Sequence, residues 1–371
     1  MHFGDLAASR IVEFQGQGPN SMTSITLSSE LAARARAADT LWLVTGAAGF
    51  IGSNIVQTLL DLGCRVRGID NFSTGSRANL DEIAQMVGRA KWANMDFVEA
   101  DIRDRVACER AVADAGIVLH QAALGSVPRS IDEPITTNDV NVGGFVNMLD
   151  MARRANARFV YAASSSTYGD EPNLPKIEDR IGRPLSPYAV TKAVNEIYAE
   201  VFSRTYQYHA IGLRYFNVFG ARQSPYGPYS AVIPAWVQAM LSGVPIKING
   251  DGETSRDFTY VGNVVQANLL AALTEKPAKA EVFNVATEAR TSLNQLVELI
   301  RDALRDVGVT YSLAPQHGAE RAGDVRHSLA SVAKARDWLG YAPTHDLQAG
   351  LAAAMPWYAE TLSKRNDNEK Q

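Results

Sequence analysis

Apolar runs of strand length alternate with segments of helical periodicity over residues 41–215. The expected helices cover residues 50–62, 136–155 and 186–207. The expected strands lie between them, at residues 41–44, 65–70, 97–100, 117–120, 158–163 and 209–215. A strand–helix–strand order is typical of a parallel sheet with helices on both faces. We therefore predict an α/β fold built on a doubly wound parallel sheet of the Rossmann type.

The pattern changes near residue 220. Residues 223–230 are rich in Pro, Gly and Tyr, which is typical of a loop, and short strands and helices mix after it. We predict a sheet domain over residues 39–220, to which the chain returns near 256–290, and a smaller C-terminal α/β lobe over 221–362. Residues 1–38 form an N-terminal extension, in which the stretch from Ser28 favours a helix.

Composition narrows the class of protein. Among 371 residues, 46% are hydrophobic and 20% charged, as in ordinary globular proteins. The net charge of −4 provides no basic field for nucleic acid. We expect no membrane partner, because no run of 18 apolar residues is present, and no secretory signal. Cys64 and Cys108 lack metal-ligand spacing, which favours a reducing, cytoplasmic compartment and no metal site.

Three glycines directly follow the first expected strand. Gly46, Gly49 and Gly52 have the spacing G-x-x-G-x-x-G and open the first expected helix. Glycines here let the backbone turn tightly and approach a pyrophosphate at the helix N-terminus. The alternative is a purely structural glycine-rich turn. Asp70 ends the second strand, 18 residues after Gly52, and a carboxylate there binds the adenosine ribose and repels a 2′-phosphate, favouring NAD over NADP.

Polar and small residues also follow the third and fourth expected strands. Asp101 and Ile102 end the third, where a carboxylate is able to bond the adenine amino group. Gln121, Ala122 and Ala123 end the fourth, where small side chains let a cofactor pass close to the backbone. Because a doubly wound sheet binds its ligand at the carboxyl ends of its strands, these positions predict one continuous dinucleotide site.

Tyr188 and Lys192 lie four residues apart in an expected helix and therefore share a face. A cationic Lys beside a phenol lowers the pKa of the Tyr. Such a phenol is able to take a proton from a sugar or alcohol hydroxyl. The alternative is a solvated helix face, because this spacing alone occurs often by chance.

Together these motifs resemble the extended short-chain dehydrogenase/reductases, the nucleotide-sugar epimerases and dehydratases. The resemblance covers residues 41–362. It is carried by Asn141 and by residues 45–52, 70–71, 101–102, 120–123, 164–169, 188–192 and 214–217. Within the family, the chain is most similar to bacterial UDP-N-acetylhexosamine 4-epimerases of polysaccharide biosynthesis. That similarity rests on the N-terminal extension and on residues 122–130, 162–166 and 321–328.

The resemblance implies roles for individual residues. Ser164, Tyr188 and Lys192 match the catalytic residues. The cofactor NAD would be bound by Gly46, Gly49, Phe50, Ile51, Gly52, Asp70, Asn71, Asp101, Ile102, Gln121, Ala122, Ala123, Asn141, Tyr188, Lys192 and Tyr215. The UDP-sugar substrate would be bound by Gly125, Ser126, Ser165, Ser166, Asn217, Val232, Asn249, Arg256, Arg321, Asp324 and Ser328. Arg256 and Arg321 have the alternative of surface ion pairs with Asp257 and Asp324.

The residues after Ser164 indicate the type of reaction. Dehydratases of the family typically have Asp-Glu there, and UDP-glucuronate decarboxylases usually have a Glu. Here Ser165 and Ser166 follow, and hydroxyls are poor acids for expelling a sugar hydroxyl. The resemblance therefore implies a 4-epimerase. A regulator that binds NAD without turnover, or a net dehydrogenase that accumulates NADH, is the alternative from another class.

Small side chains bear on the choice of sugar. Ser328 and Gly125 match positions where glucose-type relatives have bulkier residues, which leaves room for an N-acetyl group. We therefore expect interconversion of UDP-GlcNAc and UDP-GalNAc for polysaccharide precursors. Ser328 has the alternative of simply starting a helix. UDP-glucose and a UDP-uronic acid remain alternative substrates, the latter because Arg129 lies in a loop near the expected site. The resemblance also implies a homodimer that pairs helix 186–207.

Overall fold

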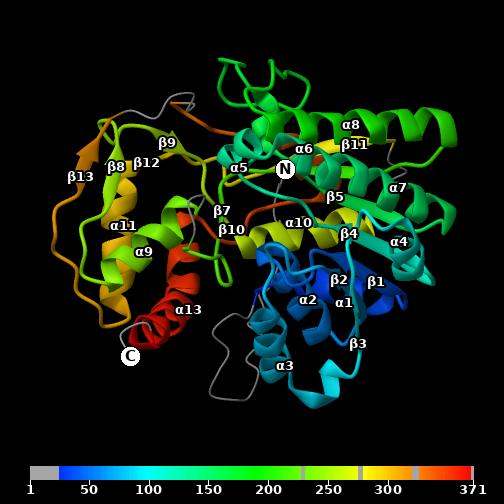
Figure 1. The fold of residues 1–371 in the computed structure, drawn as a ribbon, viewed down its shortest axis with the longest axis horizontal. Helices are drawn as coiled ribbons and strands as arrows, with labels where there is room; N and C mark the ends of the chain where they lie inside the picture. Colours follow the sequence, from blue (N-terminus) through cyan, green and yellow to red (C-terminus); the bar gives the residue numbers. More distant parts are fainter. Residues whose placement is uncertain (1–24, 227–229, 275–278, 320–325, 369–371) are drawn as a thin grey trace, which may run out of the picture.

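The computed structural model describes residues 25–226, 230–274, 279–319 and 326–368. A seven-stranded parallel sheet lies at its centre, in the order β11-β6-β5-β4-β1-β2-β3 (Figure 1). The strands are β1 (Leu41–Thr45), β2 (Arg65–Asp70), β3 (Met95–Glu99), β4 (Ala115–His120), β5 (Arg158–Ser164), β6 (Ile211–Tyr215) and β11 (Glu281–Val285). The predicted doubly wound α/β fold is confirmed, and the strand order reverses between β1 and β4.

The inner strands β1 and β4 are almost entirely apolar because both faces of the sheet are covered there. Trp42 and Val44 of β1 belong to one hydrophobic core, and Leu43 between them belongs to another. The first core packs against α2 (Phe50–Asp61), α3 (Arg77–Trp92) and α10 (Val261–Leu273). The second packs against α4 (Arg105–Val112), α7 (Phe145–Arg154) and α8 (Pro187–Tyr206).

One helix prediction from local sequence, in the N-terminal stretch, is confirmed, while the prediction of a single helix over 136–155 is wrong. Helix α1 (Ser29–Ala37) packs on α10, and the Ser28 hydroxyl caps it by accepting the Leu31 N–H at 3.2 Å, as predicted. The expected helix 136–155 is instead α6 (Pro134–Asn138), a turn of π-helix η1 (Asp139–Gly144) and α7. Hydrophobic periodicity does not distinguish a π-turn from the α-helix around it.

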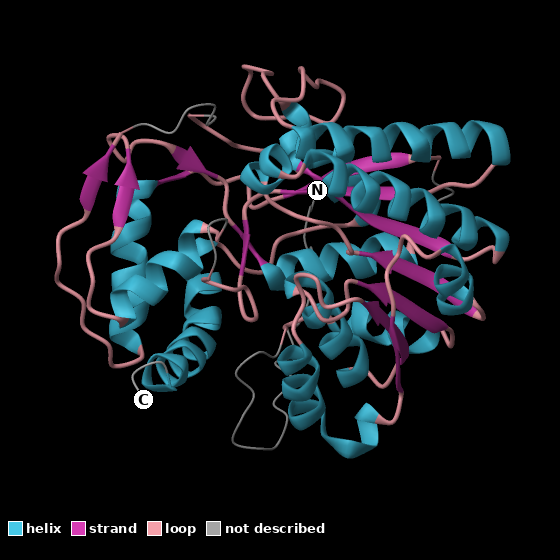
Figure 2. Cartoon of the chain, in the orientation of Figure 1, coloured by secondary structure: helices cyan, strands magenta, loops and turns pink. Residues whose placement is uncertain are grey.

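The C-terminal lobe lies beside the sheet and contains only short strands (Figure 2). They pair as β7 (Val218–Phe219) with β10 (Thr259–Tyr260), β9 (Ser255–Arg256) with β12 (Thr291–Ser292), and β8 (Lys247–Asn249) with β13 (Gln316–Gly318). Helices α9 (Val232–Leu241), α11 (Leu293–Asp306) and α13 (Leu347–Asn368) enclose a separate hydrophobic core. The remaining short elements are α5 (Val127–Asp132), the 3₁₀ turn η2 (Ser165–Tyr168) and α12 (Ala333–Leu339). Among the described residues, every helix is too short or too polar to cross a bilayer.

Candidate active site

Two glycines of the turn after β1, Gly46 and Gly52, have no room for a side chain. A Cβ on Gly46, where φ is +66°, would lie 2.9 Å from the backbone nitrogen of Ala122. A Cβ on Gly52 would lie 2.0 Å from the carbonyl oxygen of Gly46. The backbone of this turn therefore passes directly between the start of α2 and the end of β4. The first N–H groups of α2 lie at this turn, which suits the pyrophosphate of a dinucleotide.

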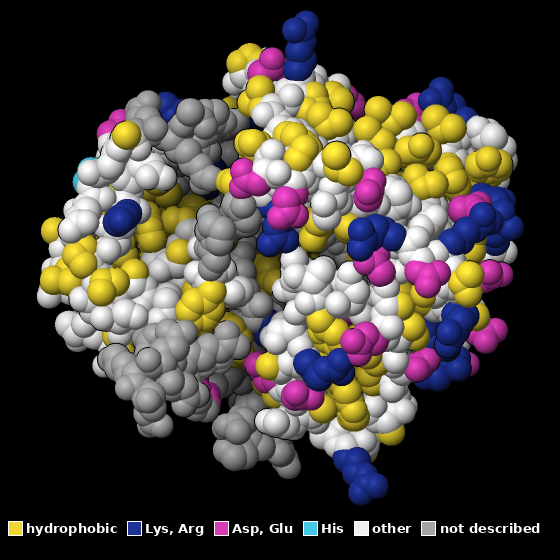
Figure 3. Space-filling model, in the orientation of Figure 1, with side chains coloured by type: hydrophobic (Ala, Val, Ile, Leu, Met, Phe, Trp, Pro, Cys, Tyr) yellow, Lys and Arg dark blue, Asp and Glu magenta, His cyan; other side chains and the backbone are white. Residues whose placement is uncertain are grey.

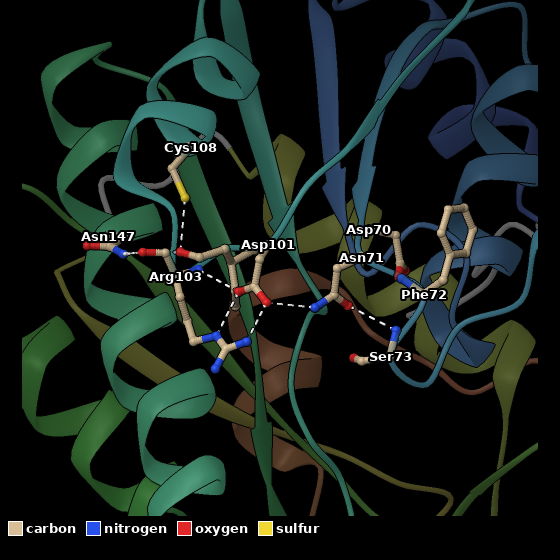
Figure 4. Close-up of polar contacts among 9 residues, drawn as sticks. Asp70, Asn71, Phe72, Ser73, Asp101, Arg103, Cys108 and Asn147 are labelled. Atoms are coloured by element: carbon tan, nitrogen blue, oxygen red, sulfur yellow. Dashed lines mark hydrogen bonds and ion pairs between the residues drawn. The ribbon is translucent and has the colours of Figure 1, made fainter.

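Asp70 and Asp101 lie on neighbouring strand ends (Figure 4). The Asp70 carboxylate accepts the N–H groups of Ala48 at 2.9 Å and Phe72 at 2.8 Å, and its burial raises its pKa. Hydrogen bonds from Arg103 lower the pKa of Asp101 to about 2, and Asn71 donates to the same carboxylate at 2.7 Å. The chain thus presents two fixed carboxylates where the adenosine of a dinucleotide would lie.

Three buried or half-buried side chains form a closed polar group beside the glycine turn. The Tyr215 hydroxyl donates to Gln121 Oε1 at 3.0 Å and accepts from Asn268 Nδ2 at 2.8 Å. Gln121 Nε2 donates to Asn268 Oδ1 at 2.9 Å. Asn268 was not predicted, although a polar residue inside the otherwise apolar α10 is a usable signal. It holds Gln121 and Tyr215 in place along the wall of the site.

The predicted catalytic residues come together where β5 ends and α8 begins. Ser164 hydrogen-bonds the hydroxyl of Tyr188, and Ser164 Oγ accepts from the N–H and the hydroxyl of Ser166 at 3.1 and 2.9 Å. Lys192 Nζ donates to the Ala162 carbonyl at 2.7 Å and lies 5.9 Å from the centre of the Tyr188 ring. Ser166 therefore orients Ser164, whose own hydrogen is free to point at Tyr188.

The pKa of Tyr188 differs from the value expected from its spacing to Lys192. Burial raises the pKa of Tyr188, and the Ser164 hydrogen bond lowers it only in part. Burial also lowers the pKa of Lys192 to about 8, against the opposing charge of Glu196. The expected lowering of the Tyr188 pKa is thus wrong for the chain alone, because burial of the phenol outweighs the hydrogen bond from Ser164. A cationic nicotinamide beside the ring would shift it the other way.

The Asn141 side chain hydrogen-bonds the backbone of Leu124. It lies in η1, where Nδ2 donates to the Leu124 carbonyl at 3.0 Å and Oδ1 accepts the Leu124 N–H at 2.8 Å. Nδ2 also contacts Thr191 Oγ1 at 3.2 Å. Asn141 thus ties the loop after β4 to α8, and its neighbour Val140 lines the site in its place.

Two cavities meet at the junction of the sheet and the lobe. The larger, about 870 Å³, is lined by Ser164 and by every residue predicted to bind the cofactor except Asn141. The smaller, about 420 Å³, lies within the lobe against Trp236 and Phe258. Both are lined by Asn217, Val218, Ser230 and Ala231. A ligand is therefore able to extend from one cavity into the other.

The residues predicted to bind substrate divide into four groups. Gly125, Ser126 and Asn217 line the larger cavity. Asn217, Val232, Asn249 and Arg256 line the smaller one. Ser165, Ser166 and Ser328 line neither cavity, and Ser328 lies in an extended segment, bonded through its N–H to Ser255. Arg321 and Asp324 lie outside the described residues.

Other residues that line the two cavities were not predicted from the sequence. Arg326 lines the smaller cavity and pairs with Asp251 at 2.7 Å, and Lys247 lines the same cavity. Arg222 lines the larger cavity, where its buried guanidinium pairs with Glu82. These cations come from separate loops and strands, so no local spacing identifies them.

Known proteins share this architecture. Residues 42–286 match the NAD dependent epimerase/dehydratase family. The chain is 36% identical to the UDP-glucose 4-epimerase of Mycolicibacterium smegmatis, covering 85% of this chain and 97% of that one.

Two solved structures are similar as well. The first is the UDP-N-acetylglucosamine 4-epimerase of Methanobrevibacter ruminantium in complex with UDP-N-acetylmuramic acid, at 36% identity and TM-score 0.79, covering 87% and 99% of the chains. The second is the UDP-glucuronic acid 4-epimerase of Bacillus cereus with UDP-glucuronic acid and NAD, at 28% identity and TM-score 0.77, covering 86% and 99%. The chain therefore belongs to the NAD-dependent epimerase/dehydratase family, among its nucleotide-sugar 4-epimerases.

Proposed function

We propose that the protein is a UDP-N-acetylglucosamine 4-epimerase, which interconverts UDP-GlcNAc and UDP-GalNAc for polysaccharide synthesis. The observation that carries this choice of sugar is Gly125. It lines the larger cavity, to which Ser164 and Tyr188 also contribute, and a Cβ built on it meets no atom within 4 Å. The open space at Gly125, in the cavity that the catalytic residues also line, suits a C2 N-acetyl group. The similarity to an epimerase named for the same sugar supports the choice.

Tyr188 and Ser164 would carry the proton transfer. Tyr188, as the phenolate, takes the proton of the sugar 4-hydroxyl, and Ser164 donates a hydrogen bond to the same oxygen. NAD⁺, which the glycine turn and Asp70 would hold, would supply the hydride acceptor for C4 and the hydride donor for the opposite face of the 4-keto sugar. Lys192 Nζ, which donates one hydrogen to the Ala162 carbonyl, would hold the nicotinamide ribose with its others. On return of the hydride, Tyr188 gives its proton back to the 4-oxygen, so no net oxidation occurs.

The lobe would hold the nucleotide while the 4-keto sugar rotates. Asn217 and Arg256 would bind the diphosphate, since both line the smaller cavity and Asn217 also lines the larger. Val232 and Asn249 would line the uridine, with Arg321 and Asp324 as the expected further contacts. Binding through the nucleotide leaves the 4-keto sugar free to rotate about the diphosphate and present its other face.

A UDP-uronic acid is the second candidate substrate. Arg129 of α5 lines the larger cavity together with Ser126, and its guanidinium is suited to pair with a C6 carboxylate. The test is to assay UDP-GlcNAc, UDP-glucose and UDP-glucuronic acid side by side on one preparation. The proposal predicts the highest kcat/KM for UDP-GlcNAc. A higher kcat/KM for either other sugar would reject the N-acetylated substrate as the natural one.

We also propose that two copies of the chain pair through α8. Hydrophobic side chains gather over α8, α5 and α6 on the surface (Figure 3). The exposed ones include Ile197, which is 58% exposed, with Val190, Tyr198, Val201, Ile131 and Ile135. Light scattering should give a dimer mass for the wild type and a monomer mass for Ile197→Asp. A monomeric wild type would reject this interface.

A further inference from the structure

Asp257 is a fully buried carboxylate that lines neither cavity. It directly follows Arg256 of β9, the residue proposed to bind the diphosphate. A buried ionisable side chain is costly unless its hydrogen-bonding capacity is used. The partners of this carboxylate therefore indicate why an acid occupies the position.

The Asp257 carboxylate joins three segments that are distant in sequence. Oδ1 accepts from the N–H and the hydroxyl of Thr287, at 3.0 and 2.9 Å. Oδ2 accepts the N–H of Ala330 at 3.2 Å. Thr287 follows β11 of the main sheet, while Ala330 lies in the segment 326–331. One side chain thus connects β9 to the sheet and to this segment.

The backbone of Asp257 holds the second proposed diphosphate ligand. Its carbonyl accepts from Asn217 Nδ2 at 2.9 Å, and the Thr259 N–H donates to the Asn217 carbonyl at 3.2 Å. Asn217 has φ of +34°, a conformation uncommon outside glycine. Both bonds to the 257–259 strand segment keep Asn217 in this conformation at the junction of the two cavities.

The segment 326–331 orients Arg256 from its other side. The Ser255 N–H donates to the Arg326 carbonyl, and the Ser328 N–H donates to the Ser255 carbonyl, both at 3.0 Å. Arg256 Nη1 donates to the same Arg326 carbonyl at 3.3 Å. The bond from Ala330 to Asp257 therefore secures the segment whose carbonyl directs the Arg256 guanidinium.

We propose that Asp257 is a positioning residue for nucleotide binding. By fixing β9 to the sheet and to the segment 326–331, it holds Asn217 and Arg256 in the positions that bind the diphosphate. The proposal rests on the proposed function, since it assumes that these two residues bind the diphosphate. Asp257 lies behind the binding wall, so its effect is on nucleotide affinity and KM rather than on the proton transfer at Tyr188.

The test is to measure UDP binding by calorimetry, with bound NAD and thermal unfolding recorded on the same samples. In Asp257→Asn, the amide is able to accept from Thr287 through its oxygen, but its NH₂ group then faces the Ala330 N–H, donor against donor. We expect the Kd for UDP and the KM for UDP-GlcNAc to rise about tenfold, with kcat changed by less than about threefold. Asp257→Glu keeps the charge but places the carboxylate one methylene further from the backbone. It should also raise the Kd for UDP and the KM for UDP-GlcNAc.

Thr287→Val is the matched control, because it removes one donor to the carboxylate and leaves the Ala330 bond intact. Its Kd for UDP should stay within about threefold of the wild type. Unchanged UDP affinity in Asp257→Asn would overturn the proposal. Loss of bound NAD and of cooperative unfolding in this variant would also overturn it, because Asp257 would then stabilise the whole fold and not only the nucleotide site. Failure of the wild type to bind UDP would instead reject the proposed function.

Discussion

The sheet half and the lobe half of the site are built by different means. In the sheet half, Asp70, Gln121 and Ser164 lie at or just after the carboxyl ends of strands five to seven residues long, so backbone ladders place them. In the lobe, strands are two or three residues long, and side-chain hydrogen bonds place Asn217 and Arg256 instead. In the proposed roles, the reacting groups are thus placed by the sheet, while the nucleotide ligands are placed by contacts between distant segments.

This difference predicts different kinetic signatures for the two halves. A substitution at the sheet half that alters the reacting groups should lower kcat. A substitution that loosens the lobe should raise KM and leave kcat nearly unchanged.

Tyr188→Phe should have the largest effect. Removing the hydroxyl that transfers the proton should lower kcat by roughly 10²–10⁴-fold, while bound NAD and UDP affinity stay near the wild-type values. Single-turnover and steady-state assays of UDP-GalNAc formation would measure it. Activity within about tenfold of the wild type would show that another group is the base.

Gly125→Leu should have the next largest effect, because it fills the space assigned to the N-acetyl group. We expect kcat/KM for UDP-GlcNAc to fall about tenfold more than kcat/KM for UDP-glucose, as is typical for steric discrimination in a pocket. Both substrates are to be assayed on the same preparation, so that UDP-glucose serves as the control. An equal loss on both sugars would contradict the assignment of this space.

His120→Gln should have a smaller effect, on stability. His120 lies buried between Phe145 and Phe159, and its Nδ1 contacts the Thr45 hydroxyl at 2.9 Å. Burial lowers its pKa to about 3, below the unfolded value of about 6.5. Its contribution to stability is therefore complete above pH 6.5 and is lost as the pH falls from 6.5 towards 3.

The expected loss from His120 is about 1.4 kcal/mol of unfolding free energy per pH unit in that range. Denaturant unfolding at pH 5.5 and 4.5, where the unfolded imidazole is almost fully protonated, should show this slope in the wild type and not in His120→Gln. Asp257, whose pKa burial raises to about 6, stabilises the fold as the pH falls, so only the difference between the two proteins isolates His120. His317→Gln, at an exposed position of β13 in the lobe, is the control, and an equal change in the pH dependence of that variant would contradict the assignment to His120.

The same difference explains what the sequence predicts well. The positions of Gly46, Gly52 and Asp70 relative to the strands follow from apolar runs and short spacings, and the structure places each of the six expected strands within two residues of its expected bounds. Strand β11, the seventh of the sheet, had no expected bounds. Tyr188 and Lys192 lie on one helix, so their spacing also indicates their proximity.

Other features depend on contacts that no local pattern contains. Asn268 bonds Gln121 across 147 positions, and Asp257 bonds Ala330 across 73. The raised pKa of Tyr188 depends on how deeply the folded chain buries it. Asn141, in a π-turn that periodicity does not reveal, bonds the Leu124 backbone and lines neither cavity.

In the proposed reaction, Tyr188 moves only the hydroxyl proton, while the hydrogen on C4 leaves and returns without exchange with water. The most direct test is to convert UDP-GlcNAc in D₂O with the purified protein and record the NMR spectrum of the product. The account predicts UDP-GalNAc that retains protium at C4. Deuterium at C4, or the absence of any UDP-GalNAc, would contradict it.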